Sequence, residues 1–488
     1  MLAQTITHAL VGLEARRVEV EAHVHDGSAA FVLVGLPDRA CQEAKQRVRS
    51  GFASAQLRWP GPRIVVNLAP AELRKEGPAF DLPIALALLA ASRQVPEEAL
   101  RGHAAIGELG LDGRVRPVPG VLAAAEGARR QGLTRIFCAA SAAPEAALAG
   151  IETVGIHHLA EAAAYLRGEW QPEQPEPPAE PVEEDGPDLA DVLGQERARR
   201  ALELAAAGAH NLLMAGPPGI GKSMLAHRLP GILPPLMRDE ALEVTRIYSV
   251  AGLLPRERPL VSSPPFRQPH HTTSATAVVG GGSGAWLRPG EVSLAHRGVL
   301  FLDELAEFQR SMLEALRQPL EDGLISVARV GGRASFPSRF QLVAAMNMCP
   351  CGGRGDAAAD CSCSPQRLAA YRAKLSRALL DRFDLVVSVP RPRAVELAGA
   401  PSESSAAVRR RVVRAREALR AGGLERSPPA EAMLTSAVDR LPLSGRGRNR
   451  VARVAASIAA LASAERVEAE HVAEALSYRT PAELAAAA

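Results

Sequence analysis

Eight consecutive residues have the types and spacing of a phosphate-binding loop. Glycines let backbone N–H groups converge on phosphate oxygens, the lysine reaches the β- and γ-phosphates, and the serine hydroxyl ligates Mg²⁺. A strand-like apolar run precedes the loop and a helical pattern follows it, as this motif requires. The segment therefore predicts that the chain binds and hydrolyses ATP with Mg²⁺. Its residues are Gly216, Pro217, Pro218, Gly219, Ile220, Gly221, Lys222 and Ser223.

Polar residues follow two further apolar runs that read as buried strands. Asp303 and Glu304 come after the first run, and Asn347 comes after the second. Because the carboxyl ends of parallel strands line the ligand crevice, we expect all three near the nucleotide. Asp303 is predicted to hold Mg²⁺, Glu304 to polarise the attacking water and Asn347 to orient it. The alternatives are an N-cap for a helix beginning near Leu305 and, for Asn347, a turn residue.

Arg382 lies between apolar residues and two acids in the sequence LLDRFD. One interpretation is a salt-bridged surface arginine. The other is an arginine finger, which stabilises transition-state charge on ATP held by a neighbouring subunit. The second interpretation requires assembly into a ring.

Four of the six cysteines lie within fifteen residues, at Cys349, Cys351, Cys361 and Cys363. In a chain without secretion signals such a cluster indicates metal ligation rather than disulfides. Two C-x-C pairs could close tetrahedrally around a structural Zn²⁺, and four unconnected reduced cysteines are the alternative.

The 488-residue chain is long enough for two to four cores, with 47% hydrophobic and 23% charged residues. The net charge of +3 means that any attraction to nucleic acid must come from local clusters. No apolar run reaches the roughly 18 residues that suggest a membrane span, and no signal peptide opens the chain. These features predict a cytoplasmic protein without a membrane partner.

A Pro- and Glu-rich stretch divides the chain, because proline blocks regular structure and the acidic residues repel one another. Before it, β-branched runs alternate with Ala/Leu-rich helical runs. After it come the strand-like runs with polar ends, and then four helical periodicities. The predicted fold class is α/β: a P-loop parallel-sheet ATPase with a helical lid, preceded by a separate α/β domain. The expected boundaries are 1–168 for the front domain, 169–188 for the linker, 189–393 for the ATPase core and 394–488 for the lid.

The strings FRQPHHTTSATAVVGGG at 266–282 and PGEVSLAHRGVLFLDELAEF at 289–308 resemble the YifB/ComM family of magnesium-chelatase-like AAA+ ATPases. The resemblance covers essentially the whole chain. It implies a hexameric ring, with Arg382 as the arginine finger and Asn347 as sensor 1. It also implies that Arg446 is sensor 2, with Arg450 and Arg453 as alternatives. A helix-2 insertion and a pre-sensor hairpin at 325–339 are expected to face the central pore.

The front domain is similar to the proteolytic domain of Lon, with two differences at the catalytic positions. Ala79 stands where the resemblance implies the serine nucleophile, and Leu122 stands where it implies the lysine base. A Ser-Lys mechanism needs both groups. We therefore expect a non-catalytic scaffold or recognition module.

Resemblance to this family implies a DNA motor that drives branch migration or unwinding in recombination. The alternatives are a magnesium-chelatase motor that remodels a protein partner, and an ATP-dependent protease, which the missing Ser and Lys disfavour. Adjacent histidines do not converge on one metal ion, so a contact with phosphate or a base is expected of them instead. Ordinary solvated loop charges are the alternative for the whole set. The candidate DNA contacts are Arg267, His270, His271, Arg329, Arg333 and Arg339.

Overall fold

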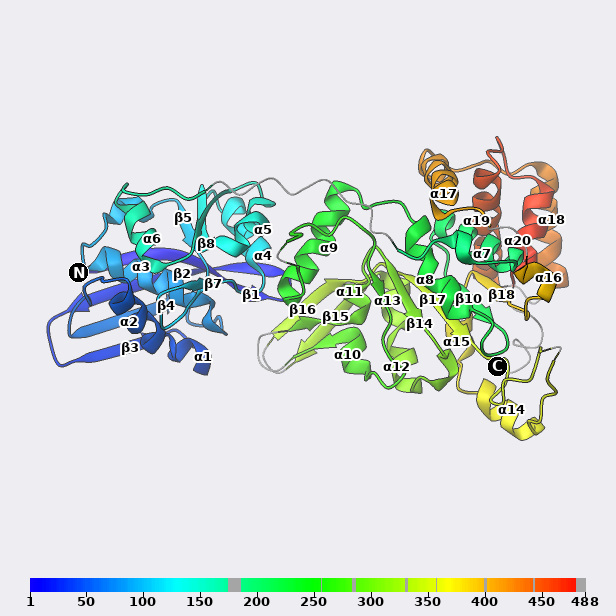
Figure 1. Ribbon diagram of the computed structural model, residues 1–488, viewed down its shortest axis with the longest axis horizontal. Helices are drawn as coiled ribbons and strands as arrows, with labels where there is room; N and C mark the ends of the chain where they lie inside the picture. The colour runs from blue at the N-terminus through cyan, green and yellow to red at the C-terminus, as the bar shows by residue number, and fades with distance from the viewer. Residues whose placement is uncertain are drawn as a thin grey trace.

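A computed structural model describes residues 1–173, 186–255, 257–282, 287–329, 332–356, 358–398, 402–441 and 444–479. Most of the predicted linker, 174–185, lies outside the described residues. Figure 1 shows an N-terminal module at one end, a central module and a helical bundle at the other end. Within the described residues, no helix is long and apolar enough to cross a membrane.

The N-terminal module, from β1 to α6, is built on a seven-stranded mixed sheet with the strand order β3-β4-β2-β1-β5-β8-β9. Strand β2 pairs antiparallel with β1 and β4, and the other neighbours pair parallel. The strands are β1 (Leu2–Val11), β2 (Glu14–His25), β3 (Ala30–Val34), β4 (Arg63–Ala69), β5 (His103–Ala105), β8 (Arg135–Ala139) and β9 (Glu152–Ile156), with a small β6 (Glu108–Leu109) and β7 (Val115–Arg116) pair. The helices are α1 (Arg39–Gln42), α2 (Ala44–Ser54), α3 (Asp81–Ala91), α4 (Val121–Arg130), α5 (Ala143–Ala147) and α6 (Leu159–Leu166).

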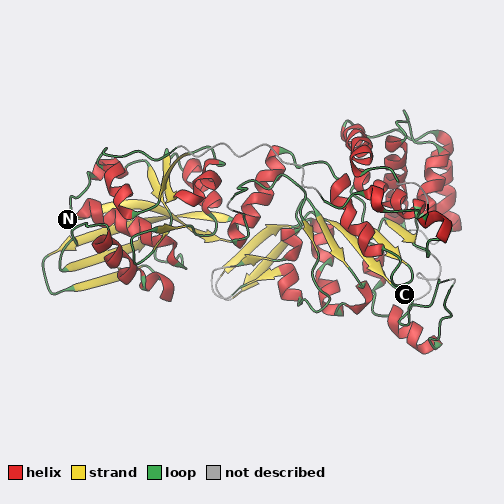
Figure 2. Cartoon of the chain, in the orientation of Figure 1, coloured by secondary structure: helices red, strands yellow, loops and turns green. Residues whose placement is uncertain are grey.

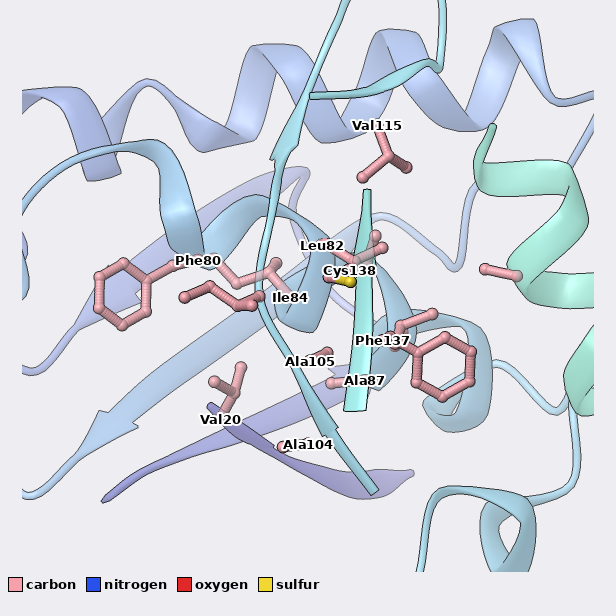
Figure 3. Packing of buried hydrophobic residues seen from close by; sticks show 14 of the residues in the cluster. Val20, Phe80, Leu82, Ile84, Ala87, Ala104, Ala105, Val115, Phe137 and Cys138 are labelled. Atoms are coloured by element: carbon pink, nitrogen blue, oxygen red, sulfur yellow. The ribbon is translucent and has the colours of Figure 1, made fainter. Parts of the chain in front are cut away.

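Helix α3 forms the centre of this module. Every one of its residues is buried, as expected for a helix that is apolar on all faces. Figure 3 shows Leu82 and Ile84 of this helix packed with Phe137 and Cys138 of β8. The buried Asp81 at its first turn accepts hydrogen bonds from Arg47 at 2.5 and 3.0 Å, so the helix start is fixed by a paired charge.

The central module, from residue 186 to α16, contains a five-stranded, all-parallel sheet with the order β11-β14-β17-β10-β18. Its three middle strands are fully buried, which explains their continuous apolar sequences. The strands are β10 (Leu212–Ala215), β11 (Phe266–Arg267), β14 (Val299–Leu302), β17 (Gln341–Met346) and β18 (Leu385–Ser388).

Helices and small strands surround this sheet, as Figure 2 shows. The helices are α7 (Glu196–Gly208), α8 (Lys222–Ile232), α9 (Arg238–Ala251), α10 (Ala275–Val279), α11 (Glu291–Leu294), α12 (Arg310–Ala315), α13 (Arg317–Asp322), α14 (Pro365–Arg372), α15 (Arg377–Leu380) and α16 (Ala394–Leu397). An antiparallel hairpin is formed by β15 (Leu324–Arg329) and β16 (Gly332–Pro337), and a second small pair by β12 (Gly280–Gly281) and β13 (Arg288–Pro289).

The C-terminal bundle packs on α7 and α8 and shares one hydrophobic core with the inner face of the sheet. Three of its helices begin directly after a serine that accepts a backbone N–H, at Ser404, Ser427 and Ser444. Apolar periodicity alone predicts these two helices from Glu431 and from Asn449, and the caps start them earlier, at Pro428 in α18 and Gly445 in α19. The helices are α17 (Ser405–Arg420), α18 (Pro428–Arg440), α19 (Gly445–Leu461) and α20 (Ala469–Ser477).

The N-terminal module contacts the central module through α9 and the β15–β16 hairpin. Arg246 of α9 pairs with Glu126 of α4 at 2.7 Å, and the Ser249 hydroxyl donates to Glu145 at 2.5 Å. The Ser249 carbonyl accepts the N–H of Gly120, the residue that precedes α4, at 3.0 Å. At the hairpin, Gly12 lies so close to Ala334 that a side chain at Gly12 would collide with it.

Two buried histidines should make the stability of the protein depend on pH, because they are protonated more readily in the unfolded chain than in the folded one. His210, which is 2% exposed and 2.8 Å from the Ser457 hydroxyl, has a pKa lowered by burial to about 4, and burial lowers the pKa of His8 to about 4 as well. Below pH 6.5 the unfolded chain takes up these protons, whereas the folded chain does not until about pH 4. The free energy of unfolding should therefore fall by about 2 kcal/mol per histidine between pH 7.5 and pH 5.

Thermal unfolding followed by circular dichroism at both pH values checks this expectation. His210→Gln should reduce the loss of melting temperature on acidification, whereas the exposed His157→Gln should not. An equal pH dependence in wild type and His210→Gln would contradict it.

Candidate active site

The loop after β10 is built for close approach of the backbone to a ligand. Gly219 and Gly221 have φ angles of +73° and +91°, in the region that favours glycine. A side chain at Gly216 would meet the Val389 carbonyl oxygen at 2.2 Å. Helix α8 begins at Lys222, so its N-terminus, with its unpaired N–H groups, faces the same loop.

Lys222 is 8% exposed and lies inside this loop. Its Nζ donates to the carbonyl oxygens of Gly216 and Pro217 at 2.8 and 2.6 Å and to Asn347 Oδ1 at 3.1 Å. Burial lowers the pKa of the Lys222 ammonium, while Asp303 and Glu304 act in the opposite direction. The lysine is thus held at the loop by groups that phosphate oxygens can replace.

Ser223 and Asp303 meet across the same cavity. The Ser223 hydroxyl donates to Asp303 Oδ2 at 2.6 Å. A hydroxyl and a carboxylate brought together beside a phosphate-binding loop form the donor set that Mg²⁺ takes in P-loop sites. The side chains therefore fit Mg²⁺.

Glu304 lies at the mouth of this cavity. Its φ of +51° is uncommon for a residue other than glycine, and its side chain makes no helix-capping hydrogen bond. The helix expected near Leu305 is a single 3₁₀ turn, Leu305–Glu307. The carboxylate is therefore available for another role than a helix cap.

The cavity above the loop, which we call the ATP cavity, has a volume of about 330 Å³. Its lining brings together the predicted residues from the ends of three strands. They are Pro218, Gly219, Gly221, Lys222, Ser223, Met224, Asp303, Glu304, Met346 and Asn347. The lining contains no arginine.

A second and larger crevice, of about 1180 Å³, lies between the sheet, α13 and the helical bundle, and shares no lining residue with the first. We call it the arginine crevice, because eight arginines line it. They are Arg297, Arg339, Arg382, Arg416, Arg420, Arg446, Arg450 and Arg453. The predicted arginine finger and every sensor 2 candidate therefore lie away from Lys222 of the same chain.

The arginines of this crevice differ in their partners. Arg382 pairs with Glu321, and burial followed by the nearby Arg446 lowers the pKa of its guanidinium. Arg450 donates to the carbonyl oxygens that flank Arg382, and Arg453 donates to the buried Asp384 at 2.7 Å.

Arg446 is exposed, and its side chain has no hydrogen bond or ion pair within the described residues. Arg450 and Arg453 thus fix the bundle to the sheet. Among the three sensor 2 candidates, Arg446 has the unengaged guanidinium.

The six candidate DNA contacts do not gather in one place. Arg333 is exposed at the end of the β15–β16 hairpin, whereas Arg339 lines the arginine crevice. Arg267 donates two hydrogen bonds to Glu291, at 2.7 and 2.9 Å. The rings of His270 and His271 lie against each other, tilted by 35° with centroids 4.0 Å apart, and His271 Nδ1 is 3.9 Å from Oε2 of Glu304, which lines the ATP cavity. The side chain of Arg329 lies outside the described residues.

The four clustered cysteines converge after β17, with their sulfur atoms all within 4.8 Å of one another. Cys349 Sγ is 3.4 Å from Cys351 Sγ, which is 3.7 Å from Cys361 Sγ. A tetrahedral Zn²⁺ with Zn–S bonds of about 2.3 Å needs sulfur–sulfur edges of about 3.8 Å, so the four thiols fit that ion. The loop also approaches the ATP cavity, because a side chain at Gly352 would meet Pro218 at 2.8 Å.

Two residues that support the site were not predicted from the sequence. Tyr371 of α14 donates its hydroxyl to the Asn347 carbonyl at 3.0 Å, and the Gln195 amide donates to the Ile220 carbonyl at 2.6 Å. Both act through backbone groups. Such contacts leave no motif, and only the folded chain brings the partners together.

A phosphate-binding loop at the carboxyl edge of a parallel sheet, with an acidic pair at the neighbouring strand end, defines a P-loop ATPase of the AAA+ type. Family models agree with this class. "Magnesium chelatase, subunit ChlI" matches residues 188–397, "Subunit ChlI of Mg-chelatase" matches 20–142, and "Magnesium chelatase, subunit ChlI C-terminal" matches 419–479.

Relatives are similar over nearly the full length. The chain is 47% identical to an uncharacterized protein of Mycobacterium tuberculosis, with 98% of each chain covered. It is 42% identical to the uncharacterized protein YifB of Escherichia coli, over 97% of this chain and 96% of that protein. It is 40% identical to the competence protein ComM of Haemophilus influenzae, over 98% and 97%. The chain belongs to the YifB/ComM family of magnesium-chelatase-like AAA+ ATPases.

Proposed function

We propose that the chain is a ring-forming, ATP-dependent DNA motor that drives branch migration or unwinding during homologous recombination. The observation that carries the ring assembly is the separation of the arginine crevice from the ATP cavity within one chain, and the action on DNA is supported by the similarity to the competence protein ComM. A site without any arginine is completed when a neighbouring subunit presents Arg382 and Arg446 to it. AAA+ ATPases commonly assemble into rings, and a head-to-tail contact of this kind closes into one. We propose a hexamer.

The residues of the ATP cavity have distinct roles in this proposal. Bound ATP would supply the phosphoanhydride bond, and its Mg²⁺ would offset the negative charge of the phosphates. Lys222 binds the β- and γ-phosphates, and Ser223 and Asp303 hold the Mg²⁺. Glu304 accepts a proton from the attacking water, and Asn347 orients that water.

Contacts with DNA are proposed at the hairpin. Its inner face packs on the central module through Ile325, Val327, Ala334 and Phe336, which leaves Arg333 exposed. An arginine that tracks phosphates gives binding without sequence preference. His270 and Arg329 remain candidates for the same path. Arg267 is held by Glu291 and Arg339 lies in the arginine crevice, so we assign them structural and interface roles.

The relative from Haemophilus influenzae is named a competence protein, which supports a part in natural transformation. The alternative function is a magnesium-chelatase-type ATPase that remodels a protein partner, supported by the family models. The two functions are distinguished by the partner that stimulates ATP hydrolysis, which is DNA for the first function and a protein for the second.

The test uses purified protein with labelled forked or four-way DNA junctions and ATP at low salt. Wild type should bind the junctions, hydrolyse ATP faster in their presence and convert them to branch-migrated products, whereas Lys222→Ala should bind without conversion. Arg333→Ala should weaken binding for all sequences alike and reduce the salt dependence by about one phosphate contact. Failure of DNA both to bind and to stimulate hydrolysis would exclude the DNA motor and leave the protein-remodelling function.

We propose a non-catalytic role for the N-terminal module. Ala79 lines a small cavity of about 90 Å³ that holds no serine, threonine or lysine. The N–H of Leu122 in the first turn of α4 is bound by the Glu145 carboxylate at 2.9 Å, and Glu145 also binds Ser249 of α9. The end of α4 where the resemblance implies the lysine base is therefore used to attach the module to α9. We assign the module a scaffold role.

We also propose that the four clustered cysteines bind one structural Zn²⁺. Purified native protein should contain about one zinc per chain by elemental analysis, since four thiolates saturate a tetrahedral site. Cys361→Ser should lose most of this zinc and raise the KM for ATP, because the cysteine loop supports Pro218. Cys138→Ala, which changes a thiol in the core of the N-terminal module, should keep it. A zinc content near zero in protein prepared without chelators would contradict the proposal.

A further inference from the structure

The connection between α2 and β4 carries a tryptophan at the surface of the N-terminal module. Trp59 is half-buried, with its ring edge-on to the buried Phe52 at 5.5 Å between centroids and stacked on Phe31 of β3 at 6.3 Å. The backbone of the preceding residue, Arg58, is fixed as well. Its N–H donates to Gln94 Oε1 at 2.8 Å, and its carbonyl accepts from Gln94 Nε2 at 2.7 Å. Contacts of the ring and of the backbone thus hold Trp59 in place.

The chain brings three exposed arginines to the same edge of the module. The Arg49 guanidinium lies over the Trp59 ring, with its central carbon 5.9 Å from the ring centroid. The Arg58 guanidinium donates to the Ser92 carbonyl at 3.4 Å, and Ser92 is followed by Arg93. None of these arginines forms an ion pair with another residue that the structure describes. We call Trp59 and the three arginines the Trp59 surface.

The chemistry of the Trp59 surface fits a single strand of nucleic acid. Guanidinium groups bind phosphates, and an aromatic ring stacks on an unpaired base. An exposed cation–π contact is weak, so a base can replace Arg49 on the ring while the guanidinium binds the neighbouring phosphate. Duplex DNA offers the same phosphates, but its bases are stacked on each other and do not reach the ring. An acidic peptide offers carboxylates to the arginines but no base to Trp59.

The Trp59 surface is separate from the elements proposed to act on DNA in the central module. Figure 1 shows α2 and β3 at the end of the N-terminal module that lies away from the central module. The β15–β16 hairpin, which carries Arg333, lies on the other side of the module boundary. A strand that contacts both places is bound at two points, which raises its affinity without a new contact at either one.

We infer that the Trp59 surface binds single-stranded DNA. One base stacks on Trp59, and the phosphates beside it contact Arg49, Arg58 and Arg93. The inference rests on the proposed action on DNA and adds to it a second site, which needs no ATP. The N-terminal module then holds an unpaired strand outside the ATPase core, in addition to its scaffold role.

Equilibrium binding of labelled oligothymidylate to the full chain, without ATP and at low salt, tests the inference. The triple variant Arg49→Ala, Arg58→Ala and Arg93→Ala should weaken binding at least about tenfold. It should also reduce the slope of log affinity against log salt by about two, because each phosphate contact with a single strand contributes about 0.7. The same loss should appear in an Arg333→Ala background, in which the hairpin contact is removed.

Two further variants test the stacked base. Trp59→Leu should weaken binding of oligothymidylate about fivefold or more with little change in the salt slope, because a stacked base is lost and no phosphate contact. Trp59→Phe, which keeps an aromatic ring beside Phe52, should lose less. Binding of a blunt duplex should not change in either variant.

The matched control is a second triple variant with the same change in charge. It replaces three exposed arginines of the same module that pair with carboxylates, and it should bind oligothymidylate as wild type does. These substitutions are Arg16→Ala, Arg17→Ala and Arg114→Ala.

Equal losses of affinity in the two triple variants would overturn the inference, and so would wild-type affinity in the first of them. Absence of oligothymidylate binding by wild type at low salt would overturn it as well. Melting temperatures of all variants near that of wild type show that a loss of affinity is not a loss of folding. The proposed function fails separately, when DNA junctions neither bind nor stimulate ATP hydrolysis, because the binding assay contains no ATP.

Discussion

Arg382→Ala is expected to lower the kcat of ATP hydrolysis by about a thousandfold, although Arg382 lines no part of the ATP cavity of its own chain. An arginine finger stabilises charge that develops on the γ-phosphate in the transition state, and its loss costs about 10³-fold or more. ATP binding measured with a fluorescent analogue should change little. Arg377→Ala is the matched control, because this exposed arginine on α15 lines neither cavity.

Mixing variants separates action between subunits from action within one subunit. Lys222→Ala removes the phosphate-binding lysine but keeps Arg382, and Arg382→Ala does the reverse. In an equal mixture of the two inactive proteins, about a quarter of the head-to-tail interfaces combine an intact cavity with an intact arginine. Activity should therefore reappear on mixing. Failure to recover activity in rings shown to contain both variants would place Arg382 in the site of its own subunit.

The second large effect is expected for Glu304→Gln, which should lower kcat by about 10²- to 10³-fold while ATP still binds. Glutamine has nearly the same shape as glutamate but cannot accept the proton of the attacking water, and general-base catalysis contributes about this factor. Lys222→Ala, in contrast, should weaken ATP binding as well, because its ammonium contacts the loop and Asn347 directly. Single-turnover hydrolysis together with equilibrium binding distinguishes the two losses.

Glu307→Gln is the control for this substitution. Glu307 ends the same 3₁₀ turn, pairs with Lys374 at 3.2 Å and does not line the ATP cavity. Its variant should keep the wild-type rate. If Glu304→Gln also keeps the wild-type rate of ATP hydrolysis, a group other than Glu304 must accept the proton of the attacking water.

The structure brings the predicted ATP-site residues together in one cavity, and the sequence could indicate them because each signal is local. The loop, Asp303 and Asn347 each follow a buried parallel strand, and such strands appear in the sequence as apolar runs. Once the strands are adjacent, their polar ends must meet. The family comparison and the α/β fold confirm the corresponding predictions, while the roles of individual residues remain proposals.

Other features depend on contacts that leave no local pattern. Strand β11 is two residues long and pairs with a strand more than thirty positions later, so the sequence alone does not show that His271 lies near Glu304. The helix starts at Ser427 and Ser444 were missed because apolar periodicity was weighed and serine capping was not. Tyr371 and Gln195 bind carbonyl groups, which every residue carries.

The N-terminal module is attached to α9 and to the β15–β16 hairpin, and the hairpin is the element proposed above to contact DNA. The N-terminal module is therefore attached to an element that is proposed to act on DNA, and not to a part of the chain with a purely structural role. A small rotation of α9 and the hairpin would displace the N-terminal module by a distance that grows away from these contacts. The displacement would be largest at the strands of the seven-stranded sheet that lie farthest from them. A force applied to the far end of the N-terminal module would in turn act on the hairpin. In the proposed motor, a module with the non-catalytic role proposed above would in this way transmit mechanical load to the ATPase core.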